Sequence, residues 1–206
     1  MKVAVIGGTG NFGVALATRL AAAGYDVIIG SRDAERARAA ALELGVVGAT
    51  NADAARAADL VVLATKAEGA LETARELREA IGKTPVLSVA AELSFTPAGV
   101  LPTPEATSIA ERIQAELDAP VIAGLHSLAA SNLGGDEAPD EDTLVCGDDA
   151  GAKALVLELA GRVTNGRAID AGPLASARAL EGMTAVIVNV NKRYRAHAGL
   201  RITGVS

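Results

Sequence analysis

Short runs of apolar residues alternate along this chain with longer segments in which apolar residues recur every fourth position. Residues 3–6 and 27–29 consist only of Val, Ala and Ile, and such unbroken runs are typical of strands buried on both faces of a parallel sheet. Between them, Phe12, Leu16 and Leu20 recur at a spacing of four, which predicts an amphipathic helix. The pattern therefore predicts strands alternating with helices from the first residues onward.

The alternation continues through the chain. We expect strands at residues 3–6, 27–29, 46–47, 60–65, 86–89, 121–123, 144–146 and 167–169, and helices at residues 11–23, 33–44, 51–58, 68–81, 109–117, 150–162 and 174–198. Asp33 and Asn51 are placed to cap two of these helices. Segment 94–107 is expected to be a loop, because it contains Pro97, Pro102 and Pro104.

Strand–helix alternation of this kind predicts an α/β fold. We expect a Rossmann-type, doubly wound parallel sheet followed by a small C-terminal α+β part. The first domain is expected to span residues 1–128 and the smaller part residues 129–206. Val186, Ile187 and Val190 give the last helix more apolar surface than a lone surface helix needs, so we expect a homodimer.

Composition narrows the possible functions. The chain has 206 residues, with 19 Lys and Arg against 25 Asp and Glu, a net charge of −6. With two Phe, two Tyr and no Trp, it lacks the basic surface and the stacking platform that nucleic-acid binding requires. One cysteine excludes an internal disulfide, and two histidines leave little for a metal site. Because the apolar runs are too short for a signal peptide or a membrane span, we expect a soluble cytoplasmic protein.

A glycine-rich fingerprint follows the first expected strand and opens the first helix. It consists of Gly8-Thr9-Gly10-Asn11-Phe12-Gly13. In this context the first glycine permits a tight turn, the second lets a pyrophosphate approach the backbone, and the third allows close helix–strand packing. The free N–H groups and the dipole of the helix start attract phosphates. These six residues are therefore predicted to bind a dinucleotide.

The end of the second strand indicates which dinucleotide is bound. An NAD site usually carries an acidic residue there, which binds the ribose hydroxyls, whereas this chain has Ser31 and Arg32. A hydroxyl and a guanidinium suit the 2′-phosphate of NADP, because arginine donates two parallel charge-assisted hydrogen bonds. Arg36, one turn later, and Thr9 are expected to add to this pocket. The sequence thus predicts NADP as the cofactor.

The sequence lacks the usual side-chain acid of an alcohol dehydrogenase. Neither Tyr25 nor Tyr194 is followed by a lysine four residues later, so the Tyr-x-x-x-Lys pair of short-chain dehydrogenases is absent. A reaction that needs little acid–base help from side chains fits better. Exchange of a hydride between two redox cofactors is such a reaction, since each cofactor carries its own chemistry.

Over nearly its whole length the chain resembles the NADPH-dependent coenzyme F420 reductases, also called F420H2:NADP+ oxidoreductases. The resemblance is carried by residues 7–13, Gly30-Ser31-Arg32, Leu125-His126, residues 145–149, and residues 170–174 followed by Arg178, Glu181, Thr184 and Asn189. It implies an N-terminal NADP domain and a smaller C-terminal part that completes a pocket for the deazaflavin ring. It also implies direct hydride transfer between NADP(H) and coenzyme F420.

The resemblance also assigns residues to the acceptor side. Arg178 and Thr184 would lie near the deazaflavin, and segment 126–130, from His126 to Ala130, would line the place where the two rings meet. Reduction puts negative charge on the carbonyl region of the deazaflavin, which a cation or donor such as His126 or Arg178 would stabilise. The alternatives are a strand-end histidine bonded to backbone and an arginine on a helix face.

Two other functions stay open from the residues. The NADP site suits a reductase of another acceptor, such as a flavin, a ferric chelate or a small imine. It also suits a non-catalytic NADP-sensing protein. In each case we expect small-molecule cofactors as partners, with neither nucleic acid nor membrane.

Overall fold

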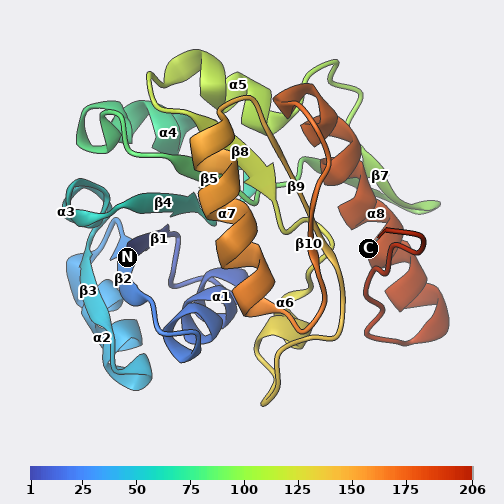
Figure 1. Ribbon diagram of the computed structural model, residues 1–206, viewed down its shortest axis with the longest axis horizontal. Helices are drawn as coiled ribbons and strands as arrows, with labels where there is room; N and C mark the ends of the chain where they lie inside the picture. Colours follow the sequence, from blue (N-terminus) through green and yellow to red (C-terminus); the bar gives the residue numbers. More distant parts are fainter. Residues whose placement is uncertain (206) are drawn as a thin grey trace.

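The computed structural model describes residues 1–205, and its centre is an eight-stranded sheet in the order β10-β9-β8-β5-β4-β1-β2-β3 (Figure 1). The strands are β1 (Lys2–Ile6), β2 (Asp26–Ser31), β3 (Val47–Thr50), β4 (Leu60–Leu63), β5 (Val86–Ser88), β8 (Val121–Gly124), β9 (Thr143–Gly147) and β10 (Ala168–Asp170). Neighbouring strands are parallel except β8 and β9. The predicted α/β fold with its mostly parallel sheet is confirmed.

The direction in which the sheet grows reverses between β1 and β4. From β1 the chain adds β2 and β3 on one side, and then adds β4, β5 and β8 on the other. In open α/β sheets, ligands bind at this reversal, outside the carboxyl ends of the strands. The topology therefore marks the ends of β1 and β4 as the place for a ligand.

Helices cover both faces of the sheet (Figure 1). One layer contains α1 (Asn11–Ala22), α2 (Ala34–Leu44) and α7 (Ala150–Val163), and the other contains α3 (Asn51–Ala57), α4 (Ala67–Ile81) and α5 (Ile109–Glu116). Along β1, Val5 joins the cluster of Leu16, whereas Ile6 joins the cluster of Ala70 on the other face. The strands are apolar throughout because both of their sides are buried.

Segment 94–107 is not a plain loop. It contains most of a β-hairpin, in which β6 (Leu93–Thr96) pairs with β7 (Gly99–Pro102). The expectation was wrong because Pro97 lies in the turn and Pro102 at the end of its strand, where neither residue interrupts the ladder. The hairpin forms a second sheet of two strands.

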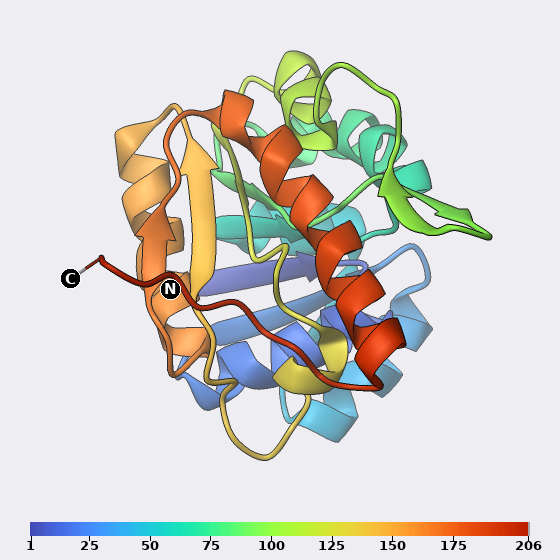
Figure 2. The ribbon, with the colours of Figure 1, turned by 90° about the vertical axis from the view of Figure 1, so that its right-hand side faces the viewer.

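The C-terminal part extends the main sheet and ends in a long helix. After η1 (Leu174–Ser176), helix α8 (Ala177–Tyr194) packs on β7 and passes β8 and β9 (Figure 2). It stops short of the expected residue 198, because Arg195 adopts a left-handed φ of 51°. Since β9 pairs with β8, residues 1–128 and 129–205 contribute strands to one sheet.

Local hydrogen bonds set the helix starts. Asp33 caps α2 as predicted, accepting from the N–H groups of Glu35 and Arg36. Asn51 is not the cap of α3: the hydroxyl of the residue before it, Thr50, accepts from the N–H of Asp53 at 3.1 Å. The four-residue helix α6 (Ala130–Leu133), which packs on α1, was not predicted.

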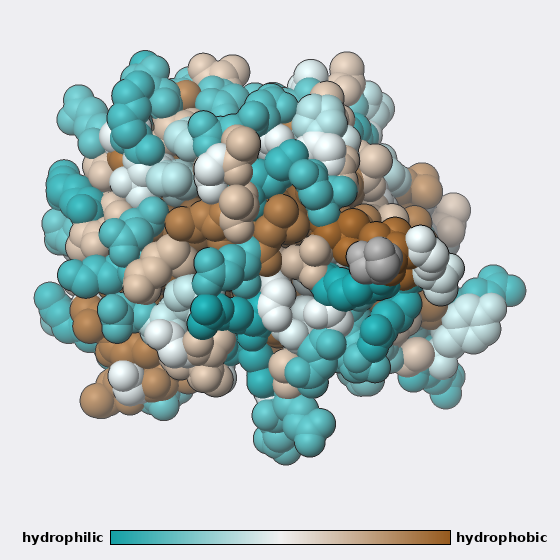
Figure 3. Space-filling view, in the orientation of Figure 1, coloured by the Kyte–Doolittle hydropathy of each residue, from teal (hydrophilic) through white to brown (hydrophobic). Residues whose placement is uncertain are grey.

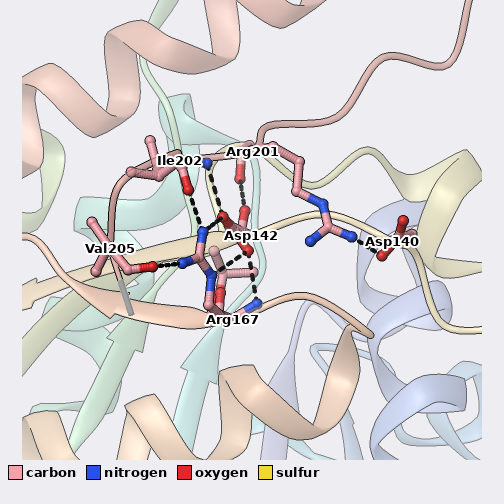
Figure 4. A network of polar contacts seen from close by, with 8 residues as sticks. Asp140, Asp142, Arg167, Arg201, Ile202 and Val205 are labelled. Atoms are coloured by element: carbon pink, nitrogen blue, oxygen red, sulfur yellow. Dashed lines mark hydrogen bonds and ion pairs between the residues drawn. The ribbon is translucent and has the colours of Figure 1, made fainter.

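A tail, residues 196–205, runs from α8 back toward the amino ends of β9 and β10 (Figure 2). Figure 4 shows its contacts: the buried carboxylate of Asp142 accepts from Arg167 at 2.7 Å and from the N–H of Ile202 at 2.8 Å. Arg167 also donates to the carbonyl oxygens of Ile202 and Val205. These bonds hold the pKa of Asp142 well below its usual range, and the hydrogen bond from Arg167 has the largest effect.

One face of the molecule is mostly polar. Figure 3 shows hydrophilic side chains over most of the face seen in Figure 1, with apolar residues exposed in a band across its middle. Within residues 1–205, no helix is long and apolar enough to cross a membrane.

Candidate functional site

The glycine-rich fingerprint forms a tight turn between β1 and α1. The N–H of Gly8 donates to the carbonyl of Val5 at 3.1 Å, and the N–H of Gly10 donates to that of Gly7 at 3.0 Å. A Cβ atom on Gly8 would lie 2.7 Å from the oxygen of Val5, and one on Gly13 would lie 2.7 Å from the Cα of Gly8. The protein's own packing therefore requires glycine at positions 8 and 13.

Gly10 differs from these two glycines. A Cβ atom at Gly10 would meet only the carbonyl oxygen of Gly7, at 3.4 Å, so its backbone faces open space. In the part of the chain that the structure describes, no side chain caps α1, and its first turn, which contains Asn11 and Phe12, carries no acid. The first N–H groups of α1 and the positive end of its dipole are thus free to bind an anion.

A cleft of about 690 Å³ opens at the carboxyl ends of β1 and β4, where the topology places a ligand. Five of the predicted cofactor residues line it: Thr9, Gly10, Ser31, Arg32 and Arg36. Clefts of this size are typical of small-molecule and cofactor sites. Residues separated by more than twenty positions in the sequence thus meet in one place.

Arginines form one wall of the cleft. Arg32 follows β2 and Arg36 lies in the first turn of α2, and both are exposed. Neither takes part in the ion pairs formed within residues 1–205. Asp33, between them, uses its carboxylate to cap α2, and its N–H donates to the hydroxyl of Ser31 at 3.2 Å. The two guanidinium groups are therefore available to a phosphate.

Three glutamates of α4 line another side of the cleft. Glu68, Glu72 and Glu76 lie at intervals of four residues, on one face of the helix, and Lys66 lines the cleft just before it. Like charges repel, so a phosphate in the cleft is favoured on the arginine side and disfavoured near the three glutamates.

Two buried polar atoms at the cleft have no hydrogen-bond partner within residues 1–205, namely Asn51 Oδ1 and Thr65 Oγ1. Burying a polar atom without a partner is costly, so these atoms fit a ligand that bonds to them. Sequence reasoning missed both as ligand contacts. The available signal was their position, because Asn51 follows β3 directly and Thr65 lies two residues after β4 at the same sheet edge.

His126 lies after β8 at this edge and is 5% exposed. The residue before it, Leu125, has a left-handed φ of 65°, which is rare for leucine and is found mainly at functional sites and turns. The ring Nε2 lies 3.1 Å from the carbonyl oxygen of Ala90. Because a carbonyl only accepts, Nε2 carries the proton and Nδ1, which has no partner within residues 1–205, is an acceptor.

His126 does not carry the positive charge that a cation stabilising the reduced acceptor would need. Burial lowers the pKa of His126 to about 4, so the imidazole is neutral at neutral pH. Its one N–H is used by the carbonyl of Ala90. His126 therefore has neither the positive charge nor the free donor that we expected to stabilise a reduced acceptor, and the backbone-bonded alternative describes it.

Thr184 and Arg178, the other two residues that we expected near the acceptor, bond to different parts of the chain. Thr184 donates its hydroxyl to the backbone carbonyl of His126 at 2.9 Å. Arg178 instead donates to the carbonyl oxygens of Thr103 and Glu105, in the segment after β7. Thr184 thus joins α8 to His126, whereas Arg178 joins α8 to that segment.

The space beside His126 is small. The cavity between His126, Ser127, Leu144, Leu180 and Met183 measures about 10 Å³, which is room for one water molecule and not for a ring system. His126 lies two strands from β4, roughly 10 Å along the sheet edge. The ring of an acceptor would therefore have to lie outside this cavity. Within residues 1–205, no cluster of His, Cys, Asp and Glu is arranged to hold a metal ion.

A family model described as NADP oxidoreductase, coenzyme F420-dependent, matches residues 2–92. Relatives named F420-dependent NADP reductase extend over the whole chain. That of Methanocaldococcus jannaschii is 35% identical, with 100% of this chain and 99% of the relative aligned. That of Methanothermobacter thermautotrophicus is 37% identical, with 100% and 96% aligned.

Solved structures show the same architecture. A protein from Arthrobacter sp. FB24 superposes with a TM-score of 0.87 at 29% identity, covering 98% of this chain and 99% of that one. An imine reductase from Streptomyces aurantiacus superposes with a TM-score of 0.66 at 21% identity, covering 95% of this chain and 62% of that one. The second likeness concerns the fold alone.

Proposed function

Because the chain belongs to the family of F420-dependent NADP reductases, we propose that it transfers a hydride between NADP(H) and coenzyme F420. The observation that carries this proposal is the match over the full length to relatives of that name at 35–37% identity. The cleft supports it independently, since it combines a bare backbone at Gly10 with two arginines that form no ion pair within residues 1–205.

The residues present fit NADP. The turn from Gly8 to Gly13 would bind the pyrophosphate through backbone N–H groups. Ser31, Arg32 and Arg36 would bind the 2′-phosphate, with Thr9 beside them. Asn51 and Thr65 would give their unpartnered oxygens to ribose hydroxyls or amide groups.

The acceptor side needs little from side chains. When bound together, the nicotinamide and the deazaflavin exchange the hydride through their own ring chemistry. The protein's task is to hold the two rings in position and to keep water away. We propose that His126, Ala130 and Thr184 contribute as neutral surfaces at the sheet edge, and that Arg178 orders the segment that borders it.

Stopped-flow absorbance tests the function. Mixing the enzyme with NADPH and oxidised F420 is expected to bleach the visible band of the deazaflavin. Reduction of a flavin, a ferric chelate or an imine in its place would support the reductase of another acceptor. Tight NADPH binding without turnover of any of these compounds would support the NADP-sensing protein.

The Arg32→Ala variant tests the cofactor in the same assay. Loss of a charge-assisted bond to the 2′-phosphate costs about 1.5–3 kcal/mol, so the KM for NADPH is expected to rise at least about tenfold, with kcat little changed. Arg38→Ala is the matched control, because Arg38 is exposed on α2 but does not line the cleft. Equal KM values for wild type and Arg32→Ala would show that Arg32 does not bind the phosphate.

We also propose that two copies of the chain associate through α8 and the β6–β7 hairpin. Val186 is 54% exposed, and Phe95 and Leu101 of the hairpin are 74% and 49% exposed. Light scattering is expected to give twice the chain mass of 20.6 kDa, and Val186→Glu is expected to lower it toward that of one chain. A wild-type mass of one chain would overturn the proposal.

A cytoplasmic location stays a prediction from the sequence.

A further inference from the structure

Arg19 on α1 is a buried charged residue whose side chain bonds to backbone carbonyls outside its own helix. Its side chain is only 8% exposed. Its Nε donates to the carbonyl oxygen of Leu133 at 3.1 Å, and its Nη2 donates to the same oxygen at 3.0 Å and to that of Gly135. Within residues 1–205 it forms no ion pair with a carboxylate.

These bonds fasten the C-terminal end of α6 to α1. A buried guanidinium needs full hydrogen bonding to offset its lost hydration, and backbone carbonyls satisfy it only while α6 keeps its place. Gly134, between the two bonded carbonyls, lies against α1, since a Cβ atom there would be 3.7 Å from the Cβ of Ala15. The far side of α6 is held by Asn132, which donates to the buried carboxylate of Glu141 at 3.0 Å.

The two ends of α1 therefore serve two different parts of the site. The N-terminus carries the phosphate-binding turn, and Arg19 lies eight residues further along, roughly 12 Å down the helix axis. Helix α6 begins at Ala130, the end of segment 126–130. A rigid helix thus links the bound dinucleotide to the backbone at the sheet edge where the acceptor would sit.

We propose that Arg19 is a positioning residue for hydride transfer, which sets the distance between the dinucleotide held by α1 and the edge formed by segment 126–130. This inference rests on the proposed function. Transfer between two rings requires reacting atoms at close range, and misplacement by about 1 Å costs about a hundredfold in rate. Arg19 touches neither ring in this account and acts through α6.

Arg19→Met keeps the apolar stem of the side chain and removes the donors. In single-turnover experiments its hydride-transfer rate is expected to fall at least about tenfold, while the Kd for NADPH stays within about twofold of wild type. Arg19→Lys keeps one donor group and is expected to restore part of the rate, because an ammonium cannot reproduce the fork of a guanidinium. Leu20→Val, a fully buried change on the same helix, is the control for loss of stability.

Amide hydrogen exchange gives a second readout that needs no acceptor. Residues 130–135 are expected to exchange faster in Arg19→Met than in wild type, and to remain slow in Leu20→Val. Unchanged exchange in residues 130–135 would overturn the inference, as would an equal fall in rate for Leu20→Val and Arg19→Met at equal thermal stability.

The proposed function and this inference fail in different ways. If wild type does not reduce F420 with NADPH, the proposed function is wrong, and the positioning role falls with it. If wild type reduces F420 and Arg19→Met does so at the same rate, the function stands and the positioning role is wrong.

Discussion

The Gly10→Ala variant is expected to fold like wild type and to lose most of its affinity for NADPH. Gly10 has φ −85° and ψ 162°, which any residue adopts, and a Cβ atom there would be 3.4 Å from its nearest neighbour. The added methyl group would instead occupy the space of the pyrophosphate. Loss of its backbone bonds, about 2 kcal/mol, corresponds to a rise of about 30-fold in the Kd, measured by fluorescence titration.

Gly13→Ala is the matched comparison for this variant. Its Cβ atom would lie 2.7 Å from the backbone Cα of Gly8 and would also contact the carbonyl oxygen of Gly7. Backbone atoms cannot yield as a side chain can, so overpacking is expected to cost about 1–3 kcal/mol of stability even without nucleotide. If Gly10→Ala binds NADPH as tightly as wild type, the phosphates do not lie on this turn.

The Glu181→Gln variant is expected to be more stable than wild type, and increasingly so as the pH rises. Glu181 on α8 is 1% exposed and accepts a hydrogen bond from the N–H of Ala110, in the first turn of α5, at 3.3 Å. Burial raises the pKa of its carboxyl to about 7, against the lowering effect of the backbone bonds. An amide oxygen accepts the same bond without a charge to bury.

The sign of the pH dependence follows from that pKa. Between about pH 4.5 and pH 7 the native carboxyl of Glu181 holds a proton that the unfolded chain has released, so its contribution to stability falls as the pH rises. Glutamine has no such loss. The advantage of Glu181→Gln in urea unfolding is expected to be small near about pH 4.5 and to reach about 3 kcal/mol above about pH 7.

His126 affects the same experiment with the opposite sign. Because the pKa of His126 is lowered to about 4, the unfolded chain binds the extra proton, and stability rises with pH between about 4 and 6.5. The wild-type curve therefore sums opposite contributions, and only the difference between variants isolates Glu181. Glu43→Gln, an exposed change on α2, controls for the altered net charge. A constant difference between Glu181→Gln and wild type from about pH 4.5 to 8 would contradict the raised pKa.

The parts of the structure that local patterns determine were predictable. The apolar runs of β1 and β2 report burial on both faces directly, and Asp33 caps α2 through bonds that span three residues. The β6–β7 hairpin was missed because proline content cannot show whether a residue lies inside a ladder or at its end. Helix α6 was missed because four residues are too few for a periodic pattern.

The candidate site also has parts that local sequence patterns predict and parts that they do not. The glycine-rich turn between β1 and α1 is a local structure, and a short motif specifies it. The neutral state of His126 results from its burial in the assembled fold. Its bond to the carbonyl of Ala90 spans thirty-six residues, and the bonds of Arg178 reach back more than seventy residues. Asn51 Oδ1 and Thr65 Oγ1, which have no partner within residues 1–205, become buried only when the chain has folded. Such properties follow from the assembled fold and have no counterpart in sequence spacing.

The tail that binds Asp142 and Arg167 has a consequence for the order of folding during synthesis. Ile202 lies sixty residues after Asp142, and Val205 lies thirty-eight residues after Arg167, yet both complete the bonding of a carboxylate buried beside β9. On a translating ribosome the strands around the cleft can assemble early, but that carboxylate must wait until residues 202–205 have been made.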